Sequence, residues 1–461
     1  MRVCLLNDTF PPVLDGVANV VTNYAEQLHE RGVPVMVGTP RYPDADYGGY
    51  PYPVVAYQSF DTAALASGYR AGNPFSGKDL AALSAFAPEI IHCHSPASSA
   101  MLARLLREET GAPVVFTYHT KYDVDVQRVL KSRLAVREVL RTMVTVIEAC
   151  DEVWAVSRGA GENLCQLGYT GQWRVMNNGV DFARGRADDA AVAAATAGYD
   201  LPSGVPVYLF VGRLMTYKGL PLILDALARL AGRGRDFRMI FVGKGPDREL
   251  LERRSAELGL TDKCFFIGPV YDREILRAWN TRADLFLFPS TFDTNGLVVR
   301  EAAACGLASV LIRGSCAAED VTDGRNGFTI DETAEALAAL LETVGGDLPL
   351  LREVGRHAMD ELYLSWADAV AAAQERYGEI LELKRAGLLP EKPREPLLSL
   401  AARSLEEQEH RRRAMESLLE LFRERAQGMM DNILEVEANA EAATAKLREQ
   451  IHRELEELRR R

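Results

Sequence analysis

The chain has 461 residues, of which 48% are hydrophobic and 26% charged, so it is long enough for two or three globular domains. Its net charge of −12 argues against a general nucleic-acid-binding protein, because binding of phosphate backbones needs clustered Lys and Arg. Seven scattered cysteines, no apolar run of membrane-spanning length and a strand at the very start predict a cytoplasmic protein with reduced thiols.

The first elements form a β-loop-α-β unit. Residues 2–6 predict a buried strand, residues 18–30 a helix and residues 33–39 a second strand. In parallel sheets built from such units, ligands bind beyond the carboxyl ends of the strands. Gly16 lies at that end, just before the helix, where a missing side chain lets a phosphate approach backbone N–H groups. A turn glycine without a ligand is the alternative interpretation.

Histidines stand at the carboxyl ends of the next strands. The strands are predicted at 90–94, 114–118 and 153–156. His92, His94 and His119 therefore lie at the edge where a ligand would lie, although a buried histidine can equally be structural. His92 and His94 share one face of their strand, but no third ligand lies nearby in sequence, which disfavours zinc.

The segment 126–144 combines apolar residues at helical spacing with a strong positive charge. Its cations are Arg128, Lys131, Arg133, Arg137 and Arg141, and Glu138 is the opposing acid. A basic amphipathic helix can lie on an anionic membrane. A core helix with a solvated basic face explains the same pattern equally well.

A second α/β domain opens with a buried strand at 207–211. Arg213 and Lys218 follow in a glycine-bounded loop, where two cations can neutralise a diphosphate. The strand at 239–242 ends in Gly243, which begins a short Gly-x-Gly loop and fits a phosphate contact in that context.

A strand, a polar loop and a helix make up residues 285–306. Residues 285–288 are the strand, residues 297–305 the helix, and Thr294 or Asn295 is expected to cap that helix. Free N–H groups at a helix start attract an anion. Two acids, Asp293 and Glu301, flank the same point and suit sugar hydroxyls, so this stretch predicts a ligand that is part phosphate and part sugar.

The chain ends in a segment with a different composition. A linker with three prolines precedes about 60 residues that contain no proline and a single glycine. Apolar or small residues recur there in steps of four and three from 415 to 447, which predicts a coiled coil within 401–461. Self-association, a helical partner protein and packing on the chain's own domains remain open.

Several of these motifs, in this order, resemble retaining glycosyltransferase family 4. They are Asp293-x7-Glu301, Arg213-x4-Lys218-Gly219, His119 in the setting Phe-Thr-Tyr-His-Thr, and Asn178-Gly-Val-Asp181. The resemblance covers about residues 1–385. Three positions depart from the family pattern, because Asp293 replaces Glu, Asp15 replaces Gly and Asn177 replaces Pro.

The resemblance implies a GT-B fold of two facing Rossmann-like domains and a tail. It implies an acceptor-side domain at 1–185, a nucleotide-sugar domain at 186–385 whose last helix crosses back, and a helical tail at 386–461. The donor-binding residues are then Gly16, Arg213, Lys218, Gly243, Asp293, Asn295, Gly296, Leu297 and Glu301. His119, Asp293, Arg213 and Lys218 are the implied catalytic residues.

Each residue has an expected role under this resemblance. Arg213, Lys218 and the helix start at Gly296-Leu297 stabilise the departing diphosphate. Asp293 holds the sugar hydroxyls, Glu301 holds the ribose, and His119 contacts the sugar near the reacting centre. Neither a metal nor another cofactor is expected, since the Asp-x-Asp matches at 44–46 and 123–125 are short and common.

The predicted function is therefore retaining transfer of a sugar, first of all glucose from UDP-glucose, to an acceptor. Resemblance to diacylglycerol glucosyltransferase-like members suggests a membrane lipid, and a small molecule or a glycan is the alternative acceptor. The segment 126–144 would then place the enzyme at the inner face of the membrane. Two rival hypotheses are a catalytically weak scaffold that acts through its coiled coil and a glycoside phosphorylase on the same fold.

Overall fold

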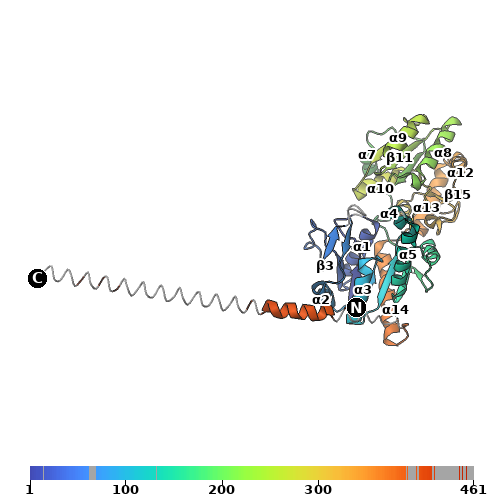
Figure 1. Cartoon of the computed structure of the whole chain (residues 1–461). Coiled ribbons are helices and arrows are strands. Elements are labelled where there is room, and N and C mark those ends of the chain that lie inside the picture. Colours follow the sequence, from blue (N-terminus) through green and yellow to red (C-terminus); the bar gives the residue numbers. More distant parts are fainter. Residues whose placement is uncertain are drawn as a thin grey trace. The chain divides into compact units, whose positions relative to one another are not determined.

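The structure is a computed structural model that describes residues 1–13, 15–61, 69–130, 132–390, 392, 401, 404–417, 420, 446, 449 and 453 (Figure 1). The chain divides into two compact units, Met1–Ser399 and Leu400–Arg461. The first unit contains both α/β domains.

Seven parallel strands form the first sheet, in the order β3-β2-β1-β6-β7-β8-β9. They are β1 (Val3–Leu6), β2 (Val35–Pro40), β3 (Val54–Tyr57), β6 (Ile90–Cys93), β7 (Val114–Tyr118), β8 (Glu152–Ala155) and β9 (Arg174–Val175). Its central strands are buried along their whole length, as expected for a parallel sheet with both faces covered. The helices of this domain are α1 (Gly16–Glu30), α2 (Gly77–Ala85), α3 (Ser98–Thr110), α4 (Tyr122–Val129), α5 (Arg133–Glu148) and α6 (Arg158–Gln166).

Six parallel strands form the second sheet, in the order β12-β11-β10-β13-β14-β15. They are β10 (Val207–Val211), β11 (Arg238–Val242), β12 (Cys264–Gly268), β13 (Leu285–Phe288), β14 (Ser309–Ile312) and β15 (Phe328–Ile330). The helices around them are α7 (Asp189–Thr196), α8 (Leu220–Gly232), α9 (Arg248–Glu257), α10 (Arg273–Arg282), α11 (Leu297–Ala304), α12 (Ala334–Val344) and α13 (Leu348–Glu361), with the short turns η1 (Thr216–Lys218) and η2 (Cys316–Ala318).

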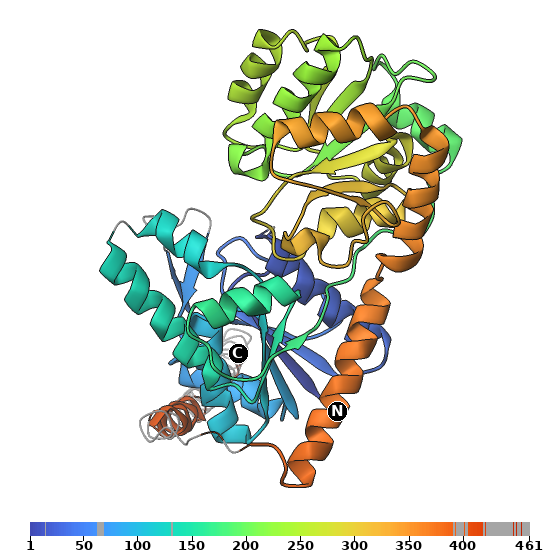
Figure 2. The ribbon, with the colours of Figure 1, turned by 90° about the vertical axis from the view of Figure 1, so that its right-hand side faces the viewer.

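Helix α14 (Trp366–Arg385) returns to the first domain after the second sheet is complete (Figure 2). Trp366, Tyr377 and Ile380 are buried in the same hydrophobic cluster as Val3 and Tyr24 of the first domain. Tyr377 stacks on Trp154 of β8 with 5.4 Å between the ring centroids. This packing holds α14 against the strands and helices of the first domain.

Both sheets reverse their strand order at one point. The reversal lies between β1 and β6 in the first sheet and between β10 and β13 in the second. Loops that leave adjacent strands in opposite directions open a crevice there, which is where parallel sheets bind ligands. His94 and Gly16 follow the first pair of strands, and Arg213 and Asp293 follow the second.

The structure corrects two features of the secondary structure. The segment 126–144 is not one helix, because α4 ends at Val129 and α5 begins at Arg133 after Ser132, whose side chain caps α5 by accepting from Ala135 N. The sequence prediction also lacked β3, β9, β15 and the antiparallel hairpin of β4 (Ser59–Asp61) and β5 (Arg70–Gly72).

Most of the predicted coiled-coil seam from 415 to 447 lies outside the described residues. Residues 404–417 are helical, and Glu409 accepts from Arg412 and Arg413 within that helix. Coiled-coil character is therefore a prediction that the structure leaves untested. Within the part of the chain that the structure describes, no helix is long and apolar enough to cross a membrane.

Candidate active site

The start of α11 faces the first domain and keeps its own N–H groups available. Its cap residue is Gly296, whose φ of 60° lies in the left-handed region that favours glycine. Thr294 and Asn295 were expected to cap this helix, and that expectation is wrong. Thr294 Oγ1 instead donates to the His119 carbonyl at 2.6 Å, and Asn295 Nδ2 donates to the Val156 carbonyl at 2.6 Å. Both side chains cross between domains, so no described side chain caps α11.

The loops after β10 and β13 bring opposite charges together. Lys218 Nζ lies 2.5 Å from Asp293 Oδ1, and Ser290 Oγ donates to Asp293 Oδ2 at 2.6 Å. The Lys218 side chain is only 9% exposed. Asp293 is therefore held from two sides, in one orientation, beside the start of α11.

Arg213 differs from Lys218 in its surroundings. Its side chain is exposed, and it makes no hydrogen bond or ion pair to any residue that the structure describes. A cation that stands unpaired at the carboxyl end of a strand is available to an anionic ligand. The geometry thus supplies one cation already paired with a carboxylate and one that is free to bind phosphate.

Glu301 lies one turn into α11 and is largely buried. Its Oε1 accepts from Arg273 Nη2 of α10 at 2.6 Å. Burial raises the pKa of Glu301 above its usual value, while the neighbouring Arg273 opposes that rise. The sequence analysis did not identify Arg273, because a separation of 28 positions from Glu301 leaves no local pattern that pairs the two residues.

His119 directly follows β7 and lies in a cluster of buried histidines. Its Nε2 lies 3.0 Å from His94 Nδ1, and the two rings stack at 5.2 Å. His92 bonds Thr117 through Nε2 at 2.7 Å and Tyr377 through Nδ1 at 2.6 Å. Burial lowers the pKa of His119 to about 3, so the ring is neutral at physiological pH.

The structure gives local structural reasons for the two glycines that were predicted to bind phosphate, Gly16 and Gly243. At Gly16, the first N–H groups of α1 are already taken, since Asp15 Oδ1 accepts from Val17 N at 2.9 Å and Ala18 N at 2.7 Å. At Gly243, an added Cβ would lie 1.9 Å from the Gly212 carbonyl, so the close approach of two loops requires glycine. Donor binding by either residue stays a prediction.

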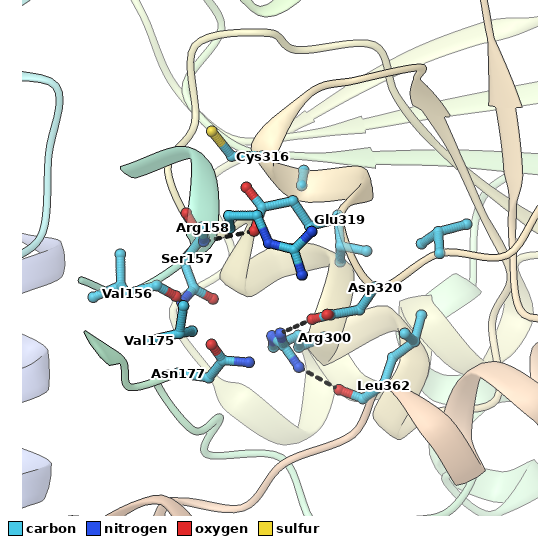
Figure 3. A pocket seen from close by; sticks show the side chains of 14 residues that line it. Val156, Ser157, Arg158, Val175, Asn177, Arg300, Cys316, Glu319, Asp320 and Leu362 are labelled. Carbon is cyan, nitrogen blue, oxygen red and sulfur yellow. Dashed lines mark hydrogen bonds and ion pairs between the residues drawn. The ribbon is translucent and has the colours of Figure 1, made fainter. Parts of the chain in front are cut away.

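A polar cavity of about 170 Å³ lies between the domains, beside α11 (Figure 3). The Glu319 carboxylate accepts there from Arg158 N at 2.7 Å and Gly159 N at 2.5 Å, at the start of α6. A Cβ on Gly159 would lie 2.6 Å from Cys316 Sγ, so glycine lets the loop after β14 dock. This contact and the Thr294 and Asn295 bonds join the two domains.

The α5 groove is a second hollow, on the first domain. Arg133, Arg137 and Arg141 stand four residues apart on the exposed side of α5, and they line a groove of about 960 Å³. Leu130 and Leu140 line the same groove, and Leu134 nearby is 62% exposed. The side chains of Arg128 and Lys131 lie outside the described residues.

Comparisons with known families match both domains. Residues 14–184 match the family described as Glycosyltransferase Family 4, and residues 195–359 match the one described as Glycosyl transferases group 1. D-inositol 3-phosphate glycosyltransferase 2 of Catenulispora acidiphila is 30% identical over 322 residues, which cover 65% of this chain and 72% of that protein.

Two further relatives are a sulfoquinovosyl transferase and an enzyme named for a glycolipid product. Sulfoquinovosyl transferase SQD2 of Arabidopsis thaliana is 26% identical over 378 residues, or 78% of this chain and 70% of that protein. Alpha-monoglucosyldiacylglycerol synthase of Streptococcus pneumoniae is 24% identical over 311 residues, or 66% of this chain and 70% of that protein.

Solved structures share the fold. Sucrose-phosphate synthase from Thermosynechococcus elongatus superposes with a TM-score of 0.67 at 21% identity, over 83% of this chain and 100% of that one. Anabaena HepE in complex with UDP and glucose gives a TM-score of 0.63 at 18% identity, over 82% and 100%. The predicted fold class, GT-B with two parallel-sheet Rossmann-like domains, is confirmed.

Proposed function

The chain belongs to the group 1 glycosyltransferases of family 4, retaining enzymes that use nucleotide sugars, and from that membership we propose a specific reaction. It transfers a hexose, with glucose from UDP-glucose as the first candidate, to a membrane lipid such as diacylglycerol. A relative named for the synthesis of alpha-monoglucosyldiacylglycerol supports this acceptor class.

The observation that carries the proposal is the charge arrangement at the start of α11. A sugar diphosphate needs cations around its phosphates and a carboxylate on its sugar hydroxyls. Lys218 and Asp293 lie 2.5 Å apart beside free helix N–H groups, and the exposed Arg213 lies in the loop after the neighbouring strand β10. This arrangement suits a leaving diphosphate and a bound sugar at the same point.

In the proposed reaction the bond between the sugar carbon and the diphosphate oxygen breaks, and its electrons stay on that oxygen. The acceptor hydroxyl attacks the same face of the sugar and passes its proton to the leaving phosphate. Lys218, Arg213 and the start of α11 stabilise the charge that develops on the diphosphate. Asp293 orients the sugar, Glu301 binds the ribose, and His119, neutral at its depressed pKa, contacts the sugar.

The α5 groove supports a lipid acceptor. Three exposed arginines at a spacing of four attract lipid phosphates, while Leu134 and its apolar neighbours can enter the interface between headgroups and acyl chains. A soluble polyol phosphate is the competing acceptor, because a relative with 30% identity is named for D-inositol 3-phosphate.

A two-stage experiment tests the proposal. Binding of UDP, GDP and ADP is measured first, and the sugar nucleotides of the preferred carrier are then assayed with diacylglycerol in mixed micelles and with D-inositol 3-phosphate. Turnover with the lipid and without added phosphate is the expected result. Transfer only to the soluble acceptor would refute the lipid assignment. Turnover that requires phosphate would indicate a phosphorylase, and nucleotide binding without any turnover would indicate a scaffold.

A further inference from the structure

One arginine joins three segments that lie far apart in the sequence. Arg273, the first residue of α10, places Nη2 2.6 Å from Glu301 Oε1 and 3.5 Å from Asp181 Oδ2. Its guanidinium carbon lies 4.4 Å from the centre of the Phe182 ring. Helix α10, helix α11 and the segment that enters the second domain therefore meet at a single side chain.

The contact leaves half of the Glu301 carboxylate unused. Arg273 occupies Oε1, whereas Oε2 makes no hydrogen bond to any described residue. The Glu301 side chain is 13% exposed, so most of the carboxylate is withdrawn from water. A buried carboxylate needs a cationic partner to stay ionised, and the stacked, bidentate-capable guanidinium of an arginine is well suited to that role.

We propose that Arg273 is a positioning residue for nucleotide binding, which fixes the Glu301 carboxylate so that its second oxygen can accept the ribose hydroxyls. This inference rests on the donor role proposed for Glu301. Phe182 and Asp181 hold the guanidinium in turn, so the carboxylate is oriented from the segment between the two domains as well as from α10.

The charges around Glu301 predict that loss of Arg273 makes nucleotide binding depend on pH. Burial raises the pKa of Glu301, Arg273 opposes the rise, and the like charge of Asp181 adds to it. Burial raises the pKa of Cys305, the residue after α11, and the nearby Glu301 charge adds to that rise. Without Arg273 the pKa rises further, so Glu301 becomes protonated as the pH falls. A protonated carboxyl is a weaker acceptor for ribose hydroxyls.

The test compares nucleotide affinity at two pH values. Binding of UDP, GDP and ADP is measured by titration calorimetry at pH 6.0 and pH 8.0 for the wild type, Arg273→Gln, Arg273→Lys and Glu301→Gln. We expect Arg273→Gln to weaken binding of the preferred nucleotide about tenfold more at the lower pH than at the higher, because one unit of pKa corresponds to a tenfold change. Arg273→Lys keeps the charge and should restore most of the affinity at pH 6.0.

A matched control removes another arginine from the same domain. Arg254 of α9 lies 2.6 Å from Asp225, and its side chain is 42% exposed, as is that of Arg273. Arg254→Gln should leave affinity unchanged at both pH values, and thermal unfolding shows whether each variant is folded.

The outcomes separate this inference from the function on which it rests. If Glu301→Gln weakens binding about equally at both pH values but Arg273→Gln binds as tightly as the wild type, or more tightly, Arg273 does not position the carboxylate. A loss in Arg273→Gln that is the same at pH 6.0 and pH 8.0 shows a merely structural role and overturns the inference. Unchanged affinity in Glu301→Gln removes Glu301 from the donor site, and both proposals for it fail.

Discussion

The charged side chains of this candidate site differ in their hydrogen-bond and ion-pair partners. Asp293 is one methylene shorter than the family's Glu, and yet it reaches both Lys218 and Ser290. Lys218 is buried and paired, whereas Arg213 is exposed and has no described partner. In the proposed reaction both cations face the leaving diphosphate, Lys218 as part of an ion pair with Asp293 and Arg213 without a described partner.

At this scale we predict the effect of removing the Lys218 charge. Lys218→Met keeps most of the length of the side chain but removes a cation that, in the proposed reaction, faces the leaving group, where charge develops in the transition state. We expect kcat to fall about a hundredfold or more, with a smaller change in KM, as for other preorganised electrostatic groups. Steady-state kinetics with the preferred sugar nucleotide measures both constants.

The control for this prediction is Lys263→Met, which removes a cation paired with Asp236 on the same domain. Its kinetics should match those of the wild type. A Lys218→Met enzyme with a normal kcat and only a raised KM would show that Lys218 serves binding and not the chemical step.

At the scale of elements, the strands β6 and β7 carry three neutral histidines into the interior. Burial lowers the pKa of His92, His94 and His119, so none is protonated in the folded state near neutral pH. In the unfolded chain each would take up a proton below about pH 6.5. The unfolded state then binds more protons than the folded state, which means that stability falls as the pH decreases.

We therefore predict an acid-sensitive first domain. Between pH 6.5 and pH 5 the free energy of unfolding should fall by up to about 1.4 kcal/mol per pH unit for each of the three histidines. Urea unfolding at half-unit intervals measures the slope. His94→Asn should reduce it, while His357→Asn, a change outside this cluster, should not. Equal slopes for His94→Asn and the wild type would contradict the prediction.

Helix α5 carries the proposed membrane contact as a unit. Charge reversal of Arg133, Arg137 and Arg141 to Glu should abolish sedimentation with anionic liposomes at low salt, since each cation near such a surface contributes about 1 kcal/mol. Reversal of Arg248, Arg253 and Arg254 on α9 is the matched control and should leave sedimentation unchanged. Wild-type protein that does not sediment with anionic liposomes would refute the membrane contact.

At the scale of the whole molecule, the two α/β domains are joined by contacts between loops. Glu319 of the second domain caps α6 of the first, and Thr294 and Asn295 donate to carbonyl groups of the first domain. The Glu319 segment follows β14 and lies against the start of α11, because a Cβ on Gly296 would be 2.9 Å from Ala317 Cβ. The contact between the domains therefore lies directly beside the proposed donor site.

We predict that this contact depends on the Glu319 charge. Glu319→Ala removes two charge-assisted hydrogen bonds, which contribute about 1.5–3 kcal/mol each before solvent exposure reduces their effect. Hydrogen exchange at residues 158–161 should become faster, and a Glu335→Ala variant on α12 should show wild-type exchange. Unchanged exchange at 158–161 in Glu319→Ala would mean that the contact contributes nothing to the association of the domains.

The tail permits a prediction that comes from its sequence pattern alone. We expect the full chain to dimerise through 401–461 and a chain that ends at Leu389 to be monomeric. Light scattering across a concentration series compares the two masses. The seam contains Ala426, Ala440 and Ala443, so the dimer should dissociate at moderate dilution. Two monomers at every concentration would refute self-association.

The amino-acid sequence was enough to predict most strands of the two sheets, the order of the motifs and the fold class, but not β3, β9 or β15. Buried parallel strands are short apolar runs, and the runs at 207–211 and 285–288 match β10 and β13 to the residue. The sequence also predicts that one edge of the second sheet carries Arg213, Lys218, Asp293 and the start of α11. Motifs that follow neighbouring parallel strands lie at the carboxyl edge of the sheet.

The partner of each polar side chain, by contrast, depends on the tertiary structure. Thr294 and Asn295 have the composition of helix caps, but the first domain offers carbonyl groups within reach, and both side chains bond there. Arg273 pairs with Glu301 because the loops after β12 and β13 place α10 beside α11. Such pairings join residues that are far apart in the chain, so they are set by strand order and domain contact, for which local spacing contains no signal.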